Sequence, residues 1–360
     1  MSAATPALPA SLGYRLPAEW EPHAATWLAW PHKPETWPGK FEPIPAVWAA
    51  LVRTLAEFEP VNICAGGEAV MAQARSLVGD LPNVTLHDIP TDDVWARDHG
   101  GMFLAAPVGQ PPALVDWEYN AWGGKYPPFD LDNAVPAHMA RLTGRRRFTP
   151  GIVLEGGAID GDGAGTLLTT EQCLLNPNRN PQLSKDDVER YLREYCCARK
   201  ILWLGGGIVG DDTDGHIDEL ARFVGPHTVV AALEVDPADE NYEPLADNFR
   251  RLQTMSDAEG RSLEVIAVPM PRAIYYDDQR LPACYMNFYI ANGVVVVPKF
   301  NDPADRVAVE TLARLFPTRQ IRGLDAVDLV WGLGAFHCIT QQEVGIVGGG
   351  VGGWGLGVGK

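Results

Sequence analysis

The fold is decided by the stretch from Lys200 to Leu233, which reads KILWLGGGIVGDDTDGHIDELARFVGPHTVVAAL. It begins with the apolar run Lys200–Leu204 and ends with Thr228–Leu233, and runs rich in Val, Ile and Leu are typical of buried strands. Helical patterns flank the stretch, over Lys185–Tyr195 before it and Leu245–Met255 after it. Strands that alternate with helices in this way predict an α/β protein.

The same alternation extends along the whole chain. Further strands are predicted at Val61–Cys64, Val84–Ile89, Ala113–Val115, Gly151–Leu154, Thr166–Leu168, Leu263–Val268, Phe288–Pro298 and Val327–Trp331. Further helices are predicted at Pro45–Phe58, Ala69–Val78 and Asp302–Leu315. Ser184, with Asp187 three residues on, is a start signal for the helix over Lys185–Tyr195, and Asn301 is a start signal for the helix over Asp302–Leu315. Predicted strands outnumber helices by about two to one and no GxGxxG follows the first strand, so several small mixed sheets fit better than one parallel sheet.

The composition is that of a globular protein with an acidic surface. The 360 residues are 46% hydrophobic and 21% charged, and their formal charge is −17. An acidic chain repels a phosphate backbone, so nucleic acid is disfavoured as a partner and cationic ligands are favoured. The chain has no apolar run of about 18 residues and no basic, apolar leader, so we expect no membrane span and a cytoplasmic location.

No Ser/Gly-rich linker and no internal repeat marks a domain boundary. We therefore expect one domain over residues 1–344. Nine of the sixteen residues from Gly345 to Lys360 are Gly, and such a segment has few side chains whose burial could offset its ordering entropy. We expect residues 345–360 to form a flexible tail.

Two acidic residues stand where binding sites commonly form. Asp98 follows a predicted strand, beside Trp95 and Arg97, and this group indicates a buried network or a cation pocket. An ion pair of Arg97 that ties down a turn explains the same residues. Glu155 follows a predicted strand and precedes two glycines, where ligands bind in many α/β proteins, although a Glu that caps a turn is the alternative.

The segment from Asp211 to Asp218, DDTDGHID, holds four carboxylates and one imidazole in eight residues. His216 and Asp218 share a face if the segment is extended and diverge if it is helical. The segment can supply a catalytic pair, a metal loop made of Asp211, Asp212, Asp214, His216 and Asp218, or the acidic start of a helix. The spacing differs from that of the twelve-residue calcium loop.

Cys338 follows a Gly-rich segment and precedes Thr340 and two Gln residues. A Cys in this setting can be a nucleophile or a small core residue, and together with His216 it forms the Cys/His arrangement of thiol catalysis. The remaining cysteines are predicted to pack in the core: Cys64, Cys173, Cys196, Cys197 and Cys284. The absence of a CxxC pair disfavours a disulfide framework and a zinc knuckle.

Taken together, these segments resemble the agmatine deiminase and bacterial (Porphyromonas-type) peptidylarginine deiminase family, which is part of the guanidine-modifying superfamily. The matching blocks follow the family's order between residues 13 and 344. They are LPAEWEPH (16–23), WLAWP (27–31), WARD (95–98), NAWGGKY (120–126), EGG (155–157), LTTEQCLLNPNRNP (168–181), DDTDGHID (211–218), NFYI (287–290) and HCITQQ (337–342).

The resemblance implies a pentein fold, in which five ββαβ-like units surround a pseudo-fivefold axis and the site lies in the central channel. It also implies a role for each proposed site residue. Cys338 is the nucleophile, His216 the general acid/base, Glu155 the partner that orients His216, and Asp98 and Asp218 the two carboxylates that clamp the guanidinium.

The implied reaction converts the guanidinium of agmatine to a ureido group, giving N-carbamoylputrescine and ammonia, through a covalent thiouronium on Cys338. Trp95 and Trp122 are expected to contact this small cationic substrate. The chemistry requires no metal and no cofactor. The alternatives are a deiminase for peptidylarginine or another guanidine, a metal-dependent hydrolase and a silent guanidine-binding protein. A homo-oligomer is compatible with each of these.

Several residues depart from the family pattern. Leu333, Ala335 and Phe336 replace Gly, Asn and Ile before the His-Cys pair, and Asp212 and Asp214 replace Glu and Asn before Gly-His. We expect these residues to flank the channel and therefore to affect the choice of substrate.

Overall fold

The computed structural model describes residues 7–345, which form five similar units. In each unit two strands pair antiparallel, and a helix leads from the second strand to a third that runs parallel to it. The unit at the end of the quoted stretch shows the pattern. There β10 (Ala221–Gly225) pairs antiparallel with β11 (Thr228–Leu233), and α8 (Tyr242–Thr254) leads to β12 (Glu264–Pro269), which is parallel to β11.

Three further units repeat this order of elements. They are β4 (Met102–Leu104), β5 (Ala113–Val115), α5 (Asp130–Thr143) and β6 (Arg146–Phe148); β7 (Asp160–Gly161), β8 (Thr166–Thr170), α7 (Lys185–Tyr195) and β9 (Lys200–Leu204); and β15 (Tyr289–Ile290), β16 (Val294–Lys299), α9 (Ala304–Leu315) and β17 (Gln320–Asp325).

The remaining unit joins the two ends of the described chain. It contains β1 (His23–Ala29), α1 (Ile44–Ala56), β2 (Val61–Cys64), α2 (Glu68–Val78) and β3 (Val84–His87). Its antiparallel partner for β1 comes from the other end of the chain, β18 (Gln341–Val344), with Trp27 opposite Gln341. The ring of units is therefore closed by the segment that directly follows Cys338.

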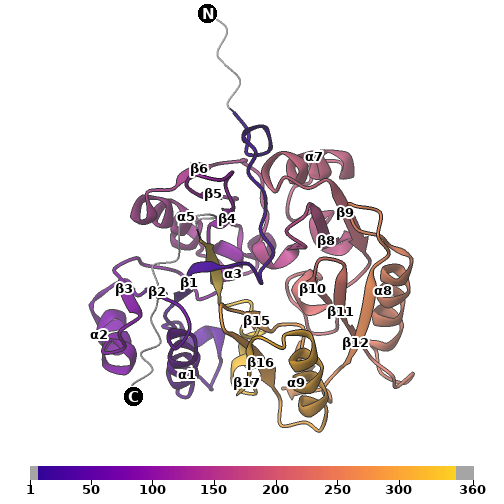
Figure 1. Cartoon of the computed structure of the whole chain (residues 1–360). Coiled ribbons are helices and arrows are strands. Elements are labelled where there is room, and N and C mark those ends of the chain that lie inside the picture. The colour runs from indigo at the N-terminus through magenta and orange to yellow at the C-terminus, as the bar shows by residue number, and fades with distance from the viewer. Residues whose placement is uncertain (1–6, 346–360) are drawn as a thin grey trace, which may run out of the picture.

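The five sheets surround a common centre, and α1, α2, α5, α7, α8 and α9 lie outside them (Figure 1). This arrangement confirms the predicted pentein fold. Shorter elements fill the centre and the loops between units. They are η1 (Ala10–Leu12), η2 (Pro34–Thr36), α3 (Ala96–His99), α4 (Ala121–Gly124), η3 (Gly156–Ala158), α6 (Glu171–Leu174), η4 (Ile217–Glu219), β13 (Tyr275–Tyr276), β14 (Gln279–Arg280) and η5 (Leu329–Gly332).

Burial explains why the apolar runs form strands and why the helices lie outside. Val294 to Val297 in β16 are all fully buried, because the outer helices cover one face of the sheet and the centre covers the other. Helix α7 turns only Val188 and Leu192 into the core. It begins at the predicted Ser184, whose hydroxyl accepts from the Asp187 amide in a capping box.

Two predicted strands and one predicted helix start are wrong. Residues 151–154 form only an isolated parallel bridge with Glu118, and the amide and carbonyl of Val153 bond to the side chain of Asn180 in place of a further strand. The run 327–331 forms η5, a 3-10 helix. Helix α9 begins after Pro303, because the Asp302 carboxylate accepts from the first helical amide and Asn301 takes no part.

No helix within residues 7–345 combines the length and the apolar content needed to cross a bilayer. The predicted flexible tail lies outside the described residues except for Gly345. The domain boundary at residue 344 stays a prediction.

Candidate active site

Cys338 lies in the loop between η5 and β18, and Asn287 holds this loop in place. The side-chain carbonyl oxygen of Asn287 accepts hydrogen bonds from the backbone amides of His337 and Cys338, at 3.0 and 3.2 Å. The Asn287 amide nitrogen is 3.0 Å from the Cys338 sulfur. Burial and the charges of Asp218 and Asp98 raise the pKa of Cys338 well above its usual value. In the free protein the sulfur is therefore a neutral thiol, and a bound cation would favour the thiolate.

His216 directly precedes η4 and lies between the two predicted clamp residues. Its Nδ1 is 3.7 Å from an oxygen of Asp98 and 4.0 Å from an oxygen of Asp218. Neither ring nitrogen has a hydrogen-bond partner in the part of the chain that the structure describes. Burial alone would lower the pKa of His216, but Asp98, the neighbouring thiol of Cys173 and Asp218 raise it well above its usual value. The ring is therefore a proton donor without a fixed acceptor.

The two clamp carboxylates are both buried, but their environments differ. Asp98 accepts from the indole nitrogen of Trp122 and from the Gly157 amide, each at 3.0 Å. Burial and the charges of Asp218 and Glu155 raise the pKa of Asp98 to about 6. The pKa of Asp218 is lowered in spite of burial, because the imidazole of His337 donates a hydrogen bond to it. Asp218 is thus ionised well below neutral pH, while Asp98 loses its charge as the pH falls below about 6.

Glu155 lies behind His216, where Arg179 binds it. The Arg179 Nε is 2.6 Å from one Glu155 oxygen, and the other oxygen has no partner among residues 7–345. The His216 ring, the Cys173 sulfur and this carboxylate each place an atom within 4.8 Å of the others. That Cys173 lies beside His216 was not predicted from the sequence, where Cys173 was expected to pack in the core. Three atoms at such distances can bind a metal ion, but the positive charge of the Arg179 guanidinium, which already binds Glu155, repels a metal cation there.

Gly157 leaves room for the groups of the site. A Cβ at this position would lie 2.6 Å from His216 Nδ1 and 2.7 Å from an Asp98 oxygen. No residue with a side chain fits at position 157 without displacing one of these groups.

A cavity of about 230 Å³ opens over Cys338 and Asp98. The indoles of Trp95 and Trp122 lie in its wall. Their ring planes cross at 75°, with 6.3 Å between the ring centroids. The rest of its lining is mixed, with charged Lys33, Glu35, Asp93 and Asp212 among polar and apolar side chains. The cavity therefore presents aromatic side chains together with several carboxylates and one lysine.

Only some of the residues that depart from the family pattern reach this cavity. Asp212 and Leu333 line it, whereas Ala335 and Phe336 are buried away from it. Asp214 turns toward Arg179, with 2.6 Å between oxygen and nitrogen. Contrary to expectation, Ala335, Phe336 and Asp214 are thus not among the residues that line the cavity, because Ala335 and Phe336 are buried and the Asp214 carboxylate bonds to Arg179 and Lys125.

The acidic segment does not converge as a metal loop. Asp211 accepts from the backbone amides of Thr213 and Gly215 and so shapes the turn. Asp212 contacts Tyr126, and Asp214 bonds to Arg179. These carboxylates point in different directions, which contradicts the five-ligand loop.

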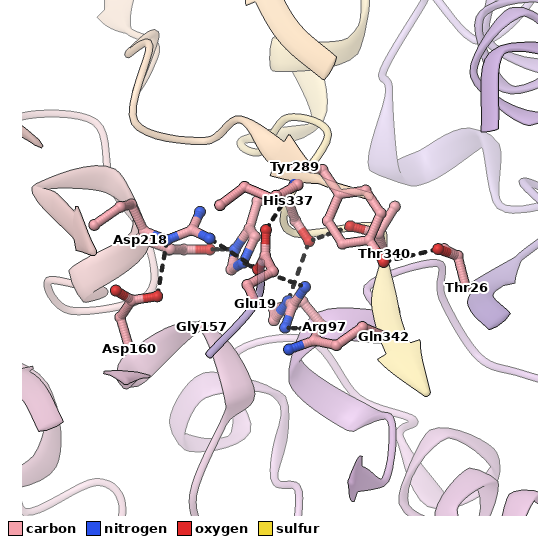
Figure 2. Close-up of polar contacts among 12 residues, drawn as sticks. Glu19, Thr26, Arg97, Gly157, Asp160, Asp218, Tyr289, His337, Thr340 and Gln342 are labelled. Atoms are coloured by element: carbon pink, nitrogen blue, oxygen red, sulfur yellow. Dashed lines mark hydrogen bonds and ion pairs between the residues drawn. The ribbon is translucent and has the colours of Figure 1, made fainter. Parts of the chain in front are cut away.

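Behind the site lies a second polar cluster that the sequence did not reveal. Glu19 accepts from His337 and Arg222, both at 2.8 Å, and lies 3.4 Å from Arg97 (Figure 2). Asp160 binds the other side of Arg222 at 3.0 Å. The alternative interpretation of Arg97 as an ion-pair residue is thus correct, and Asp98 next to it faces the cavity all the same.

The profile of the family described as Porphyromonas-type peptidyl-arginine deiminase matches residues 15–343 of this chain. The chain belongs to this family. An agmatine deiminase of Pseudomonas aeruginosa (strain UCBPP-PA14) is 40% identical over 359 residues, which cover 93% of this chain and 96% of that relative.

Solved structures of family members have the same architecture. The agmatine deiminase of Enterococcus faecalis superposes with a TM-score of 0.90 at 34% identity and covers 96% of this chain and 100% of that one. A C. jejuni agmatine deiminase variant with substrate bound gives a TM-score of 0.85 at 31% identity, over 93% of this chain and 97% of that one. A dimethylarginine dimethylaminohydrolase, at 10% identity and a TM-score of 0.50, shares the fold alone.

Proposed function

We propose that this protein is an agmatine deiminase, which hydrolyses agmatine to N-carbamoylputrescine and ammonia. The observation that carries the proposal is the convergence of one thiol, one imidazole and two carboxylates at the base of the cavity. The Cys338 sulfur is 3.7 Å from Asp218, and His216 lies within 4.0 Å of both Asp98 and Asp218. Two carboxylates and a cation-attracting aromatic wall suit a guanidinium, which is planar and positively charged.

Binding prepares the nucleophile. As the guanidinium enters between Asp98 and Asp218, its charge lowers the cost of the Cys338 thiolate, and the thiol proton leaves to solvent. The two carboxylates fix the plane of the guanidinium so that its central carbon faces the sulfur. Trp122 donates to Asp98 and thereby holds that carboxylate in the same orientation.

Two displacements at carbon complete the reaction. The thiolate of Cys338 adds to the central carbon, His216 gives its proton to the departing nitrogen, and the C–N bond breaks to release ammonia. Water then adds to the thiouronium carbon and gives a proton to His216. The C–S bond breaks, the remaining hydroxyl proton leaves to solvent, the thiolate returns and the neutral ureido product leaves. Glu155 keeps the ring of His216 in place between these two proton transfers.

The proposal is tested by ammonia release from agmatine, free arginine and a peptide that ends in arginine. We expect agmatine to be the preferred substrate. If the protein released ammonia from the peptide but not from agmatine, it would be a peptidylarginine deiminase. Binding of agmatine without turnover by the wild type would favour the silent guanidine-binding protein. Activity lost to exhaustive EDTA and restored by a divalent ion would favour the metal-dependent hydrolase.

The covalent step has its own test. Cys338→Ser should lower kcat by about 10⁴-fold or more, as expected for loss of a unique nucleophile. His216→Ala, incubated with agmatine and quenched with acid, should carry an added mass equal to agmatine minus ammonia on the peptide that contains Cys338. An adduct on any other cysteine would refute Cys338 as the nucleophile. Assembly into a homo-oligomer stays a prediction that light scattering would decide.

A further inference from the structure

His337 is the neighbour of the proposed nucleophile, and its ring bridges two carboxylates. Its Nδ1 is 2.6 Å from an oxygen of Asp218, and its Nε2 is 2.8 Å from an oxygen of Glu19 (Figure 2). The residue is only 2% exposed, so water does not compete for either contact. The ring therefore joins the site at the base of the cavity to the cluster behind it.

The two contacts fix the protonation state of this ring. The pKa of Glu19 would be raised by burial, but Arg222, His337 and Arg97 hold it well below its usual value. The pKa of Asp218 is lowered as well. Ionised carboxylates only accept hydrogen bonds, so both ring nitrogens of His337 must donate. The ring, 2.6 and 2.8 Å from these two oxygens, thus has the contacts of an imidazolium.

The imidazolium determines which oxygen of Asp218 is free. The Asp218 Oδ2 accepts from His337 and also from the Asn287 amide at 3.2 Å. The Oδ1 has no partner in the described part of the chain and lies 4.0 Å from His216 Nδ1. With one oxygen held, the plane of the carboxylate is set and its free oxygen is directed toward His216.

The far side of the imidazolium is anchored just as firmly. The second oxygen of Glu19 accepts from the Ile290 amide at 2.7 Å, and Arg222 donates to Glu19 from β10. The charged groups around His337 are Asp218 from η4, Glu19 from the N-terminal segment, Arg97 from α3, Asp160 from β7 and Arg222 from β10. A ring held at both ends cannot rotate away from Asp218.

We propose that His337 is a positioning residue for guanidine hydrolysis, an imidazolium that holds Asp218 by one oxygen and leaves the other to bind the guanidinium. This rests on the proposed function of the site. The positive charge also lies behind Asp218, on the side away from the substrate. There it offsets part of the repulsion between Asp218 and the thiolate that forms 3.7 Å away.

A matched pair of variants separates the two ends of the ring. The amide of His337→Asn reaches about as far as Nδ1 and can still donate to Asp218, whereas that of His337→Gln extends toward Glu19. Both side chains are neutral and similar in size. We expect similar Tm values for the two, with kcat/KM for agmatine roughly 10- to 100-fold lower in His337→Gln, the range for a lost hydrogen bond to a charged group. Equal kcat/KM at equal Tm, or a more active Gln variant, would overturn the proposal.

A second measurement uses the wild type and does not depend on whether the variants fold. NMR of protein with ¹⁵N-labelled histidine reports the protonation of both ring nitrogens. The His337 signals are assigned either as those that disappear in His337→Asn or His337→Gln, or through a bond correlation to Cys338. Two protonated ring nitrogens are expected under the conditions of the activity assay, and a neutral tautomer would refute the imidazolium. Wild-type turnover of agmatine is measured first. If it is absent the proposed function fails, whereas a neutral ring in an active enzyme contradicts only the role of His337.

Discussion

Gly157→Ala places a methyl group at the centre of the proposed site, and its effect can be worked out from distances. The new Cβ would lie 2.6 Å from His216 Nδ1 and 2.7 Å from an Asp98 oxygen, whereas ordinary contact begins at 3.4 Å. To restore ordinary contact, His216 must move by about 0.8 Å, the difference between 3.4 and 2.6 Å, and Asp98 by about 0.7 Å, the difference between 3.4 and 2.7 Å. A misplacement of about 1 Å lowers an enzymatic rate by about 100-fold, or about 2.7 kcal/mol in transition-state stabilisation.

We expect Gly157→Ala to lower kcat/KM for agmatine by this amount while the protein stays folded, with overpacking that lowers the free energy of unfolding by about 1–3 kcal/mol. Initial rates of ammonia release and urea denaturation measure the two effects. Gly225→Ala is the control, because its Cβ would meet only Thr228 at 3.6 Å. If Gly157→Ala kept kcat/KM within about threefold of the wild type, the geometry assigned to His216 and Asp98 would be wrong.

Three further predictions concern the charges of the site. Because the pKa of Asp98 is about 6, its carboxylate is ionised above that pH and protonated below it, so kcat/KM should fall below pH 6; a pH–rate profile in which Asp98→Asn retains this limb would contradict the assignment. Trp122→Phe removes the indole that donates to Asp98, so the acidic limb of the pH–rate profile should move to higher pH and kcat/KM should drop by about tenfold or more. A change in packing alone would lower kcat/KM without moving this limb. Arg222→Met leaves Glu19 and Asp160 buried without their shared cation and should lower the free energy of unfolding by about 3–5 kcal/mol in urea denaturation; a loss below about 1 kcal/mol would show that the cluster is not held by charge.

The fold was predictable where burial leaves a clear pattern in the sequence. Strands with both faces covered, such as β16, are continuous apolar runs. The strands that the sequence did not reveal include β17 and β18, which are polar or half-exposed and form because they complete a unit. Helix α5 was missed as well, since Pro136 in its interior interrupts the helical pattern. Pairing between distant segments determined these elements, and local propensity did not.

The candidate site was predictable in its parts but not in its contacts. The resemblance pointed to Cys338, His216, Glu155 and the two clamp residues, and the structure brings them together. The sequence could not exclude the metal loop, because it shows that carboxylates are close along the chain but not where their side chains point. Glu19 was missed for a related reason, since its partner His337 lies 318 residues away. The available signal was that Glu19, Arg97 and His337 each lie in a block that matches the family.

The closure of the ring by β18 has a consequence for the synthesis of this protein. The nucleophile lies only three residues before Gln341, whose strand pairs with β1 near the other end of the chain. Before β18 is made, β1 lacks the antiparallel partner that it has in the described structure, and the Cys338 loop is held only by residues that precede it, such as Asn287. A nascent chain can therefore complete four units and still hold no assembled site. Assembly of the complete site waits for β18, which follows every residue of the proposed catalytic set along the chain.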